Sequence, residues 1–278
     1  MQSALARLTN AGVEDPLREA RILLGISTGL SREEILRGLD QPLSQDQLTT
    51  FDAFITRREN REPLAYIRGT QEFYGREFRV NPSVLIPRPE TELLVDFALA
   101  KIHGTESVAV IDACTGSGCV GISIAAEFAS CNVLCTDISQ LALDVAQENA
   151  TVLGIANQCQ FVLADGLSPF PIRSADIIVA NPPYISEDEV EKLQPEVSQF
   201  EPRIALSGGQ TGFEIIERLV TDATRVCRDG AWFALEIGIG QDEQVAQLLV
   251  IAGFSNVNIE NDLAGIQRVV SGQLFERK

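Results

Sequence analysis

Apolar strands and amphipathic helices alternate along the last two thirds of this 278-residue chain, and this alternation restricts the fold more than any other feature. From residue 90 onward the pattern predicts helices at 90–103, 119–129, 140–153, 211–227 and 241–252, and strands at 108–112, 132–137, 159–164, 176–181, 231–237, 256–260 and 267–273. Strands that alternate with helices form a parallel sheet with helices on both faces. The sequence therefore predicts an α/β, Rossmann-like fold around a seven-stranded sheet.

The first part of the chain has a different pattern, and three domains are expected. Residues 1–70 read as a small helical bundle, with a capping box at Ser31–Glu34 and a second helix starting at Ser44. Residues 71–89 alternate around Gly75 as a β-hairpin and continue into a stiff proline-rich linker. Residues 90–278 form the third and largest domain.

Composition indicates a soluble globular protein, with 45% hydrophobic and 22% charged residues. We expect a cytoplasmic protein, because no apolar run reaches membrane-spanning length and the first residues lack the plan of a secretory signal. The six cysteines include no Cys-x-x-Cys pair and there is one histidine, His103. We therefore expect reduced, buried thiols and no metal site.

The net charge of −17 is unevenly distributed. Residues 1–89 balance 12 arginines against 12 acidic residues, whereas residues 90–278 carry 10 basic and 27 acidic residues. Part of this charge lies in the segment 187–191. Such a surface repels the phosphates of a nucleic acid, so the charge counts against a nucleic-acid substrate.

A glycine turn follows the first strand of the α/β region, and it points to a nucleoside cofactor. Gly116 and Gly118 allow a ligand close to the backbone at a helix N-terminus, and Asp137 ends the next strand, where a carboxylate can accept both ribose hydroxyls. A dinucleotide fingerprint would have glycine at Cys114, and Asp112 would repel a pyrophosphate. The cationic groups of S-adenosylmethionine suit an acidic pocket better, and Asp165 ends the third strand where adenine is expected.

The sequence Asn181-Pro182-Pro183-Tyr184 ends a predicted buried strand and is the second signal. Two prolines fix φ and remove two N–H donors, so the turn presents carbonyl oxygens, and Asn181 adds a side-chain acceptor. Tyr184 adds an aromatic face. This arrangement suits a planar NH2 group, such as an amide or a nucleobase amine. Beside a methyl-donor site, the turn predicts an amino-group methyltransferase.

At this point the chain resembles the peptide chain release factor glutamine methyltransferases (the PrmC/HemK family) over essentially its whole length. The motifs that carry the resemblance are Ile86-Pro87-Arg88-Pro89-Glu90-Thr91-Glu92, Asp112 to Gly118, Asn181-Pro182-Pro183-Tyr184, Glu201-Pro202-Arg203-Ile204-Ala205-Leu206 and Glu236-Ile237-Gly238. The resemblance implies a class I S-adenosylmethionine-dependent methyltransferase that methylates the glutamine of the Gly-Gly-Gln motif in class 1 release factors. The N-terminal helical domain would then recognise the substrate.

The resemblance also implies site residues. The implied cofactor contacts are Cys114, Thr115, Gly116, Ser117, Gly118, Asp137, Asp165, Gly166 and Asn181, and the implied catalytic residues are Asn181, Pro182, Pro183 and Tyr184. Two departures matter. Family members often have glycine where Cys114 stands, so we expect this loop to avoid a positive φ there. Some members place an aromatic residue at the Gly166 position, so adenine stacking must come from elsewhere.

Other functions remain possible from the sequence alone. The acceptor could be a nucleic-acid base or another ribosomal protein, and the chain could also be a non-catalytic scaffold that binds S-adenosylmethionine or a translation factor. We expect a monomer that makes no direct contact with nucleic acid or membrane. Gly208-Gly209-Gln210 repeats the expected substrate motif within the chain itself, and we interpret it as a flexible turn before a helix with Thr211 as its N-cap.

Overall fold

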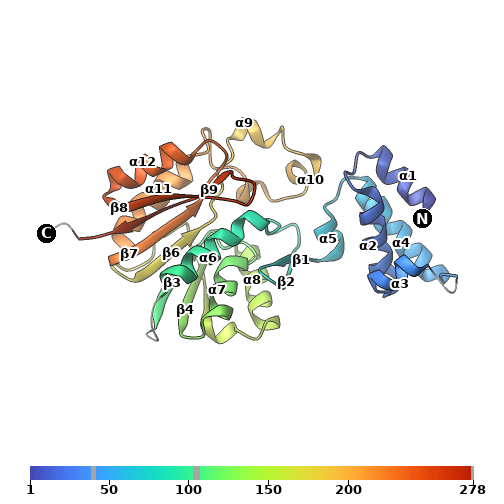
Figure 1. The fold of residues 1–278 in the computed structure, drawn as a ribbon, viewed down its shortest axis with the longest axis horizontal. Coiled ribbons are helices and arrows are strands. Elements are labelled where there is room, and N and C mark those ends of the chain that lie inside the picture. The colour runs from blue at the N-terminus through green and yellow to red at the C-terminus, as the bar shows by residue number, and fades with distance from the viewer. Residues whose placement is uncertain (39–41, 103–106, 277–278) are drawn as a thin grey trace. The chain divides into compact units, whose positions relative to one another are not determined.

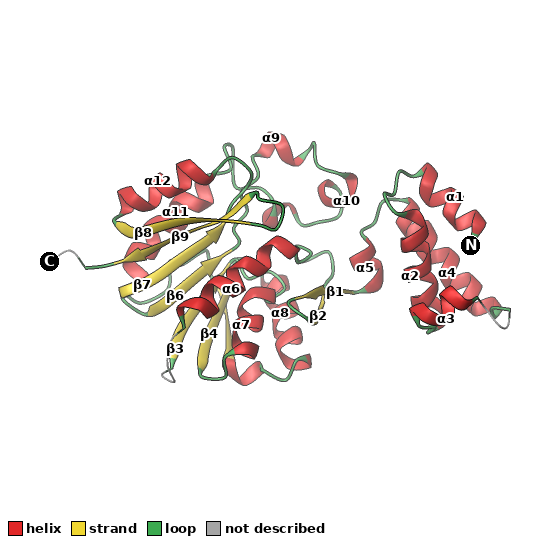
Figure 2. Cartoon of the chain, viewed as in Figure 1, coloured by secondary structure: helices red, strands yellow, loops and turns green. Residues whose placement is uncertain are grey.

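The computed structural model describes residues 1–38, 42–102 and 107–276. These residues form two compact units (Figures 1 and 2). The first comprises Met1–Thr70 together with Gln194–Phe200, and the second comprises Gln71–Leu193 and Glu201–Lys278. The chain therefore leaves the second unit after Leu193 and rejoins it at Glu201. His103 lies outside the described residues.

The first unit is helical. Its helices are α1 (Gln2–Asn10), α2 (Pro16–Thr28), α3 (Arg32–Arg37), α4 (Gln45–Glu59), α5 (Leu64–Arg68) and α10 (Pro195–Ser198). Both expected helix starts are confirmed, because Ser31 caps α3 and Ser44 caps α4 with reciprocal capping boxes. The core of the unit is built mainly from the apolar faces of α1, α2 and α4, with Leu8, Leu23 and Ile55 almost completely buried.

The second unit begins with a hairpin of β1 (Thr70–Phe73) and β2 (Arg76–Arg79). Tyr74 and Gly75 between them both have positive φ, at 49° and 68°, as a two-residue turn requires. The remaining strands are β3 (Val108–Ala113), β4 (Cys131–Asp137), β5 (Cys159–Leu163), β6 (Ala175–Ala180), β7 (Cys227–Glu236), β8 (Phe254–Asn261) and β9 (Gln267–Leu274).

These last seven strands form one sheet in the order β5-β4-β3-β6-β7-β9-β8. The predicted seven-stranded α/β sheet is confirmed, but it is not wholly parallel. Strand β9 pairs antiparallel with both β7 and β8. β8 and β9 are joined by the short connection at 262–266, whereas a parallel crossover needs a dozen or more residues, so these two strands must run antiparallel. The strand order reverses between β3, the first strand of this sheet along the chain, and β6. Sheets of this kind bind ligands at such a reversal, at the carboxyl ends of the strands.

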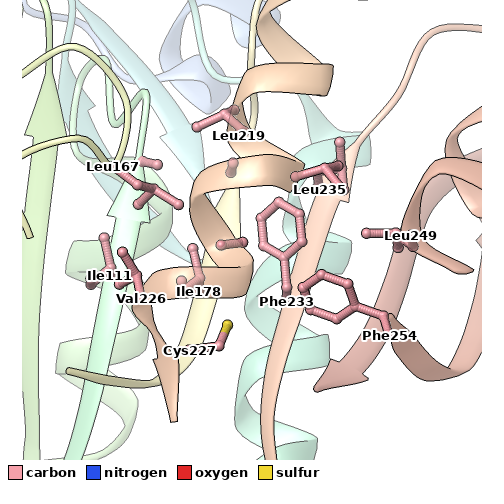
Figure 3. Close-up of a cluster of buried hydrophobic side chains, with 14 of the residues drawn as sticks. Ile111, Leu167, Ile178, Leu219, Val226, Cys227, Phe233, Leu235, Leu249 and Phe254 are labelled. Atoms are coloured by element: carbon pink, nitrogen blue, oxygen red, sulfur yellow. The ribbon is translucent and has the colours of Figure 1, made fainter. Parts of the chain in front are cut away.

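Helices cover both faces of the sheet (Figures 1 and 2). They are α6 (Glu92–Lys101), α7 (Cys119–Glu127) and α8 (Gln140–Val152) on one face and α11 (Glu214–Val226) and α12 (Asp242–Ala252) on the other. Short helical turns are η1 (Pro89–Thr91), η2 (Ala156–Gln158), α9 (Glu187–Val190) and η3 (Arg203–Ala205). Side chains of adjacent strand residues point to opposite faces of the sheet. Ile178 therefore packs in the hydrophobic cluster with α11 and α12 (Figure 3), whereas Ile177 packs in the cluster with α6, α7 and α8.

In the described part of the chain, none of the helices combines the length and apolar character needed to cross a membrane.

Candidate active site

The glycine turn between β3 and α7 is held by hydrogen bonds to the side chain of Asp112. Its Oδ2 accepts hydrogen bonds from Thr115 Oγ1 at 2.5 Å and from Gly121 N at 2.9 Å. Asp112 is only 1% exposed, and burial raises its pKa to about 7 although both hydrogen bonds act in the opposite direction. A Cβ at Gly121 would come within 2.9 Å of Asp112 Oδ2, so this position requires glycine.

Asp137, at the end of β4, supports the turn from the neighbouring strand. Its Oδ2 accepts from Gly116 N and its Oδ1 from Ser139 N, each at 2.9 Å. Burial raises the pKa of Asp137, and the backbone donors offset part of that rise. Each carboxylate oxygen can accept a second hydrogen bond, so the side chain can still receive two ribose hydroxyls.

The expectation that the turn avoids positive φ at Cys114 is wrong. Cys114 has φ 59°, in the left-handed region that favours glycine. The next residue shows what this conformation achieves, because Thr115 N donates to Thr136 O at 2.9 Å and so ties the turn to the end of β4. Burial raises the pKa of the Cys114 thiol, with Asp137 and Asp112 adding to the rise. This thiol is therefore neutral and a weak nucleophile.

One cavity gathers most of the predicted site residues. The predicted residues that line it are Cys114, Thr115, Gly116, Ser117, Asp137, Asp165, Gly166, Asn181 and Pro183. Gly118, Pro182 and Tyr184 were also predicted but are not among the lining residues. The linker and the turn η1 supply further lining groups, among them Arg88 and Thr91. The cofactor turn and the Asn181 turn, 63 residues apart in sequence, therefore open on the same cavity.

Asp165 has a partner that the sequence did not reveal. Arg218 on α11 donates to both of its carboxylate oxygens, at 2.6 and 2.8 Å, and both side chains are part-exposed at the cavity. Among the described residues that line the cavity, none carries an aromatic ring. The planar guanidinium of Arg218 is thus a group at this end that could stack on a base. No sequence spacing links β5 to α11, so reasoning from sequence could not find this pair.

The Asn181 turn is held by a buried carboxylate, Glu236, at the end of β7. Asn181 Nδ2 donates to Thr91 Oγ1 at 3.1 Å, and Thr91 Oγ1 donates to Glu236 Oε2 at 2.6 Å. Tyr184 OH donates to Glu236 Oε1 at 3.1 Å. Burial raises the pKa of Tyr184, and the nearby Glu236 carboxylate raises it further. Three separate motifs therefore meet in one hydrogen-bonded network.

Tyr184 is also held along its backbone and ring. Gln241 Nε2 donates to Tyr184 O at 3.0 Å, while Gln241 Oε1 accepts from Gly238 N at 2.8 Å. A Cβ at Gly238 would approach the Tyr184 ring to 3.2 Å. The ring is half-buried beside this glycine, and its orientation is fixed from three sides.

A second buried carboxylate links two motifs for which the sequence predicted no role. Glu201 forms an ion pair with Arg88, and its Oε2 accepts from Ile86 N at 3.2 Å. The Glu201 side chain is 1% exposed, and burial raises its pKa against the opposing effect of Arg88. The pair holds the proline-rich linker at the cavity that Arg88 lines.

The Gly208-Gly209-Gln210 segment packs closely behind the Asn181 turn. A Cβ at Gly208 would lie 2.6 Å from Pro183 O, and Gly208 N donates to Ile185 O at 2.9 Å. The glycine is therefore required for close packing. The predicted N-cap, Thr211, is wrong, because the N-cap of α11 is Phe213. Thr211 lies two residues before that N-cap, and its backbone N donates to the Glu214 side chain.

The cavity has features that fit S-adenosylmethionine. Ser117 Oγ is buried and has no hydrogen-bond partner within the described residues, so a donor is available for a ligand carboxylate. A Cβ at Gly116 would meet nothing within 4 Å, which leaves room above the turn. Asp137 and Asp165 place carboxylates along the wall, as a cationic ligand favours. When bound, S-adenosylmethionine supplies the methyl group that is transferred.

Comparison with known proteins agrees with this fold. Residues 1–69 match the model of the PrmC N-terminal domain, and residues 90–197 match the methyltransferase small domain. The chain is 40% identical over 272 residues to a release factor glutamine methyltransferase of Koribacter versatilis, covering 98% of this chain and 96% of that protein. It is 38% identical to one of Cereibacter sphaeroides, covering 99% and 97%.

A solved structure adds a likeness of fold alone. The ribosomal protein L11 methylase of Lactobacillus delbrueckii subsp. bulgaricus superposes with a TM-score of 0.52 at 20% identity, covering 74% of this chain and 90% of that one. The fold and the cavity define a class I S-adenosylmethionine-dependent methyltransferase. Within that class, the chain belongs to the release factor glutamine methyltransferase family.

Proposed function

We propose that the protein methylates the side-chain amide nitrogen of the glutamine in the Gly-Gly-Gln motif of class 1 release factors. The observation that supports this most directly is the shared cavity, because Asn181 and Pro183 line it together with the cofactor turn. An acceptor for amide N–H groups therefore lies beside the methyl-donor site. The names of the relatives, release factor glutamine methyltransferases, supply the acceptor class.

The chemistry to be assisted is attack by a weak nucleophile. The lone pair of an amide nitrogen is delocalised into its own carbonyl. We propose that Asn181 Oδ1 and the Pro182 carbonyl accept the two N–H groups and hold the lone-pair side of the nitrogen toward the methyl group. Fixed oxygen dipoles then meet the positive charge that grows on nitrogen. Tyr184 packs on the amide plane, and proximity supplies the rest.

No general base is needed in this scheme. The alkylated amide is acidic enough to lose its proton after transfer. The carboxylates of the network are already engaged, since Glu236 accepts from Thr91 and Tyr184. The residues that we propose as catalytic therefore act as acceptors and as a packing surface.

An alternative acceptor is a nucleic-acid base, because it also presents a planar NH2 group. Residues 90–278 carry 27 acidic and 10 basic residues, and this negative charge opposes binding of a polyanion. The acidic α9 begins only three residues after Tyr184, with Glu187, Asp188 and Glu189 exposed. We therefore propose a protein acceptor and no direct contact with nucleic acid.

One assay tests the function. The protein is incubated with labelled S-adenosylmethionine and, in parallel, with release factor, release factor carrying Ala in its Gly-Gly-Gln loop, duplex DNA and RNA. Label is expected only in the release factor that has glutamine in its Gly-Gly-Gln loop. Transfer to the Ala form would contradict the proposed acceptor atom, and transfer to either nucleic acid would favour the alternative.

Replacing Asn181 tests the mechanism. Asn181→Ala removes one of the two proposed acceptors, so kcat should fall by about 100-fold or more, while the Kd for S-adenosylmethionine changes little. Asn157→Ala on the exposed turn η2 is the matched control and should retain activity. Near-normal kcat in Asn181→Ala would contradict the role of this side chain.

We propose that the helical domain of residues 1–70, which matches the PrmC N-terminal domain over residues 1–69, contributes to recognition of the release factor. The hairpin and linker of residues 71–89 then connect it to the catalytic domain of residues 90–278. We further propose that the protein acts in the cytoplasm, because its acceptor is a factor of translation, and that it is a monomer.

A further inference from the structure

We infer that Thr91 and Glu236 are positioning residues that fix which end of the Asn181 amide faces the substrate. This inference deepens the proposed function and rests on it. It concerns two motifs, the segment 86–92 that contains Thr91 and the strand end at Glu236, that the proposed mechanism does not use. Neither side chain accepts a hydrogen bond from the substrate in that mechanism.

The positions of the protons in the network determine the orientation of the Asn181 amide. An ionised carboxylate accepts hydrogen bonds and donates none, so Glu236 receives the hydroxyl proton of Thr91 across 2.6 Å. Thr91 has no second proton, and its oxygen can only accept from its other neighbour. That neighbour is the Asn181 side chain, 3.1 Å away. Its NH2 end must therefore face Thr91.

The consequence for catalysis lies at the other end of the amide. An asparagine side chain has one donor end and one acceptor end. With Nδ2 committed to Thr91, Oδ1 is left as the free acceptor, and within the described residues it receives no hydrogen bond. The opposite orientation would present an NH2 group to the NH2 group of the substrate, which is repulsive. Amide orientation therefore decides whether the site can hold its acceptor.

Burial makes this orientation persistent. Thr91 is 1% exposed and Glu236 is 2% exposed, so solvent cannot readily replace either partner, and an unmet buried polar group is costly. Glu236 also receives Tyr184 OH at 3.1 Å. One carboxylate thus orients both polar side chains of the catalytic turn, from strands and linker far apart in sequence.

The charge state of Glu236 should appear in the pH dependence. Burial raises its pKa, Thr91, Tyr184 and Arg268 oppose the rise, and Glu90 adds to it. As pH falls through this raised pKa, Glu236 gains a proton that it can donate. Thr91 is then free to donate to Asn181, and the orientation is lost. Activity should therefore decline on the acid side at a higher pH than an ordinary glutamate would give.

Paired substitutions at Thr91 test the inference. Thr91→Val keeps the shape but removes the hydroxyl, and kcat should fall by about 100-fold while the Kd for S-adenosylmethionine stays within about twofold. Thr91→Ser restores the hydroxyl and should recover most of that loss. Thr151→Val on the exposed face of α8 is the control for the substitution itself. Equal kcat for Thr91→Val and the wild type would overturn the inference.

Glu236→Gln is the second variant, because Gln can donate. It should lower kcat and remove the acid-side decline of the pH profile, whereas an unchanged profile would overturn the role of Glu236. A readout without turnover separates this inference from the proposed function. The Asn181 side-chain NH2 signal, assigned by its loss in Asn181→Asp, should exchange slowly in wild type and Thr91→Ser and rapidly in Thr91→Val. If the wild-type protein shows slow exchange of this amide but does not methylate release factor, the proposed function is contradicted and the positioning role of Thr91 is not. Rapid exchange in wild type would overturn the inference.

Discussion

At the scale of single residues, Asp112 shows how the cofactor turn depends on a buried acid. Both of its donors, Thr115 and Gly121, bond to the same oxygen, Oδ2. An asparagine could accept both bonds through its own oxygen, with no charge to bury. Its folded pKa of about 7 lies above the ordinary value of 3.8, so the folded state holds a proton that the unfolded state has lost. Stability contributed by this group is therefore present below pH 3.8 and is lost as pH rises toward 7.

The predicted consequence is that Asp112→Asn stabilises the protein without bound cofactor. Its stability gain over the wild type should grow between pH 4 and 7 and stay level above that, reaching at most about 4 kcal/mol at about 1.4 kcal/mol per pKa unit. Thermal melts over that pH range measure it, with Asp144→Asn on the exposed face of α8 as control. A gain independent of pH would show that Asp112 is not protonated in the folded state.

At the scale of elements, the short helix α10 is held in the first unit by ion pairs. Glu196 accepts from Arg58 Nη2 at 2.9 Å and from Arg61 Nη2 at 2.5 Å. Burial raises the pKa of Glu196, but the hydrogen bonds from the two arginines outweigh it, so the pKa is lowered overall. Arg58 is 5% exposed and also bonds Glu19. The guanidinium is therefore a buried charge shared by two carboxylates.

Glu196→Ala should release this segment. Removing one partner of a largely buried pair costs about 2 to 4 kcal/mol, so amide exchange across residues 194–200 should accelerate by about 30-fold or more, at tenfold per 1.4 kcal/mol. Glu191→Ala, which breaks the exposed pair with Arg203, is the matched control and should change exchange by less than about fivefold. Equal exchange in the two variants would show that the ion pairs do not hold α10.

The elements also show what could be predicted from sequence. Hydrophobic periodicity located all seven strands of the main sheet, because each is an apolar run bounded by turns, and the short connection at 262–266 could have revealed the antiparallel pair. Contacts between distant segments could not be found this way. Thr91 lies 145 residues before Glu236, and Glu196 returns to helices that end more than 130 residues earlier. These contacts depend on how strands and loops pack, and no local spacing encodes them.

At the scale of the whole molecule, the net charge of −17 should control association with the acceptor. The exposed acidic residues of α9 follow the catalytic turn directly, so we expect a basic surface around the acceptor glutamine. Attraction between exposed charges is screened by salt over about 10 Å at 0.1 M. The Kd for release factor should therefore rise steadily between about 50 and 300 mM salt, which is roughly a third to twice the physiological ionic strength.

A pair of matched variants locates this attraction. Glu187→Gln removes one exposed charge beside the turn and should weaken binding at low salt and flatten its salt dependence, because fewer charges remain to be screened. Glu243→Gln on α12 removes the same charge from another exposed helix and should leave both unchanged. The measurement is Kd by titration at several salt concentrations. A Kd that does not vary with salt would exclude charge as the basis of recognition, and equal effects of the two variants would show that net charge acts without a defined surface.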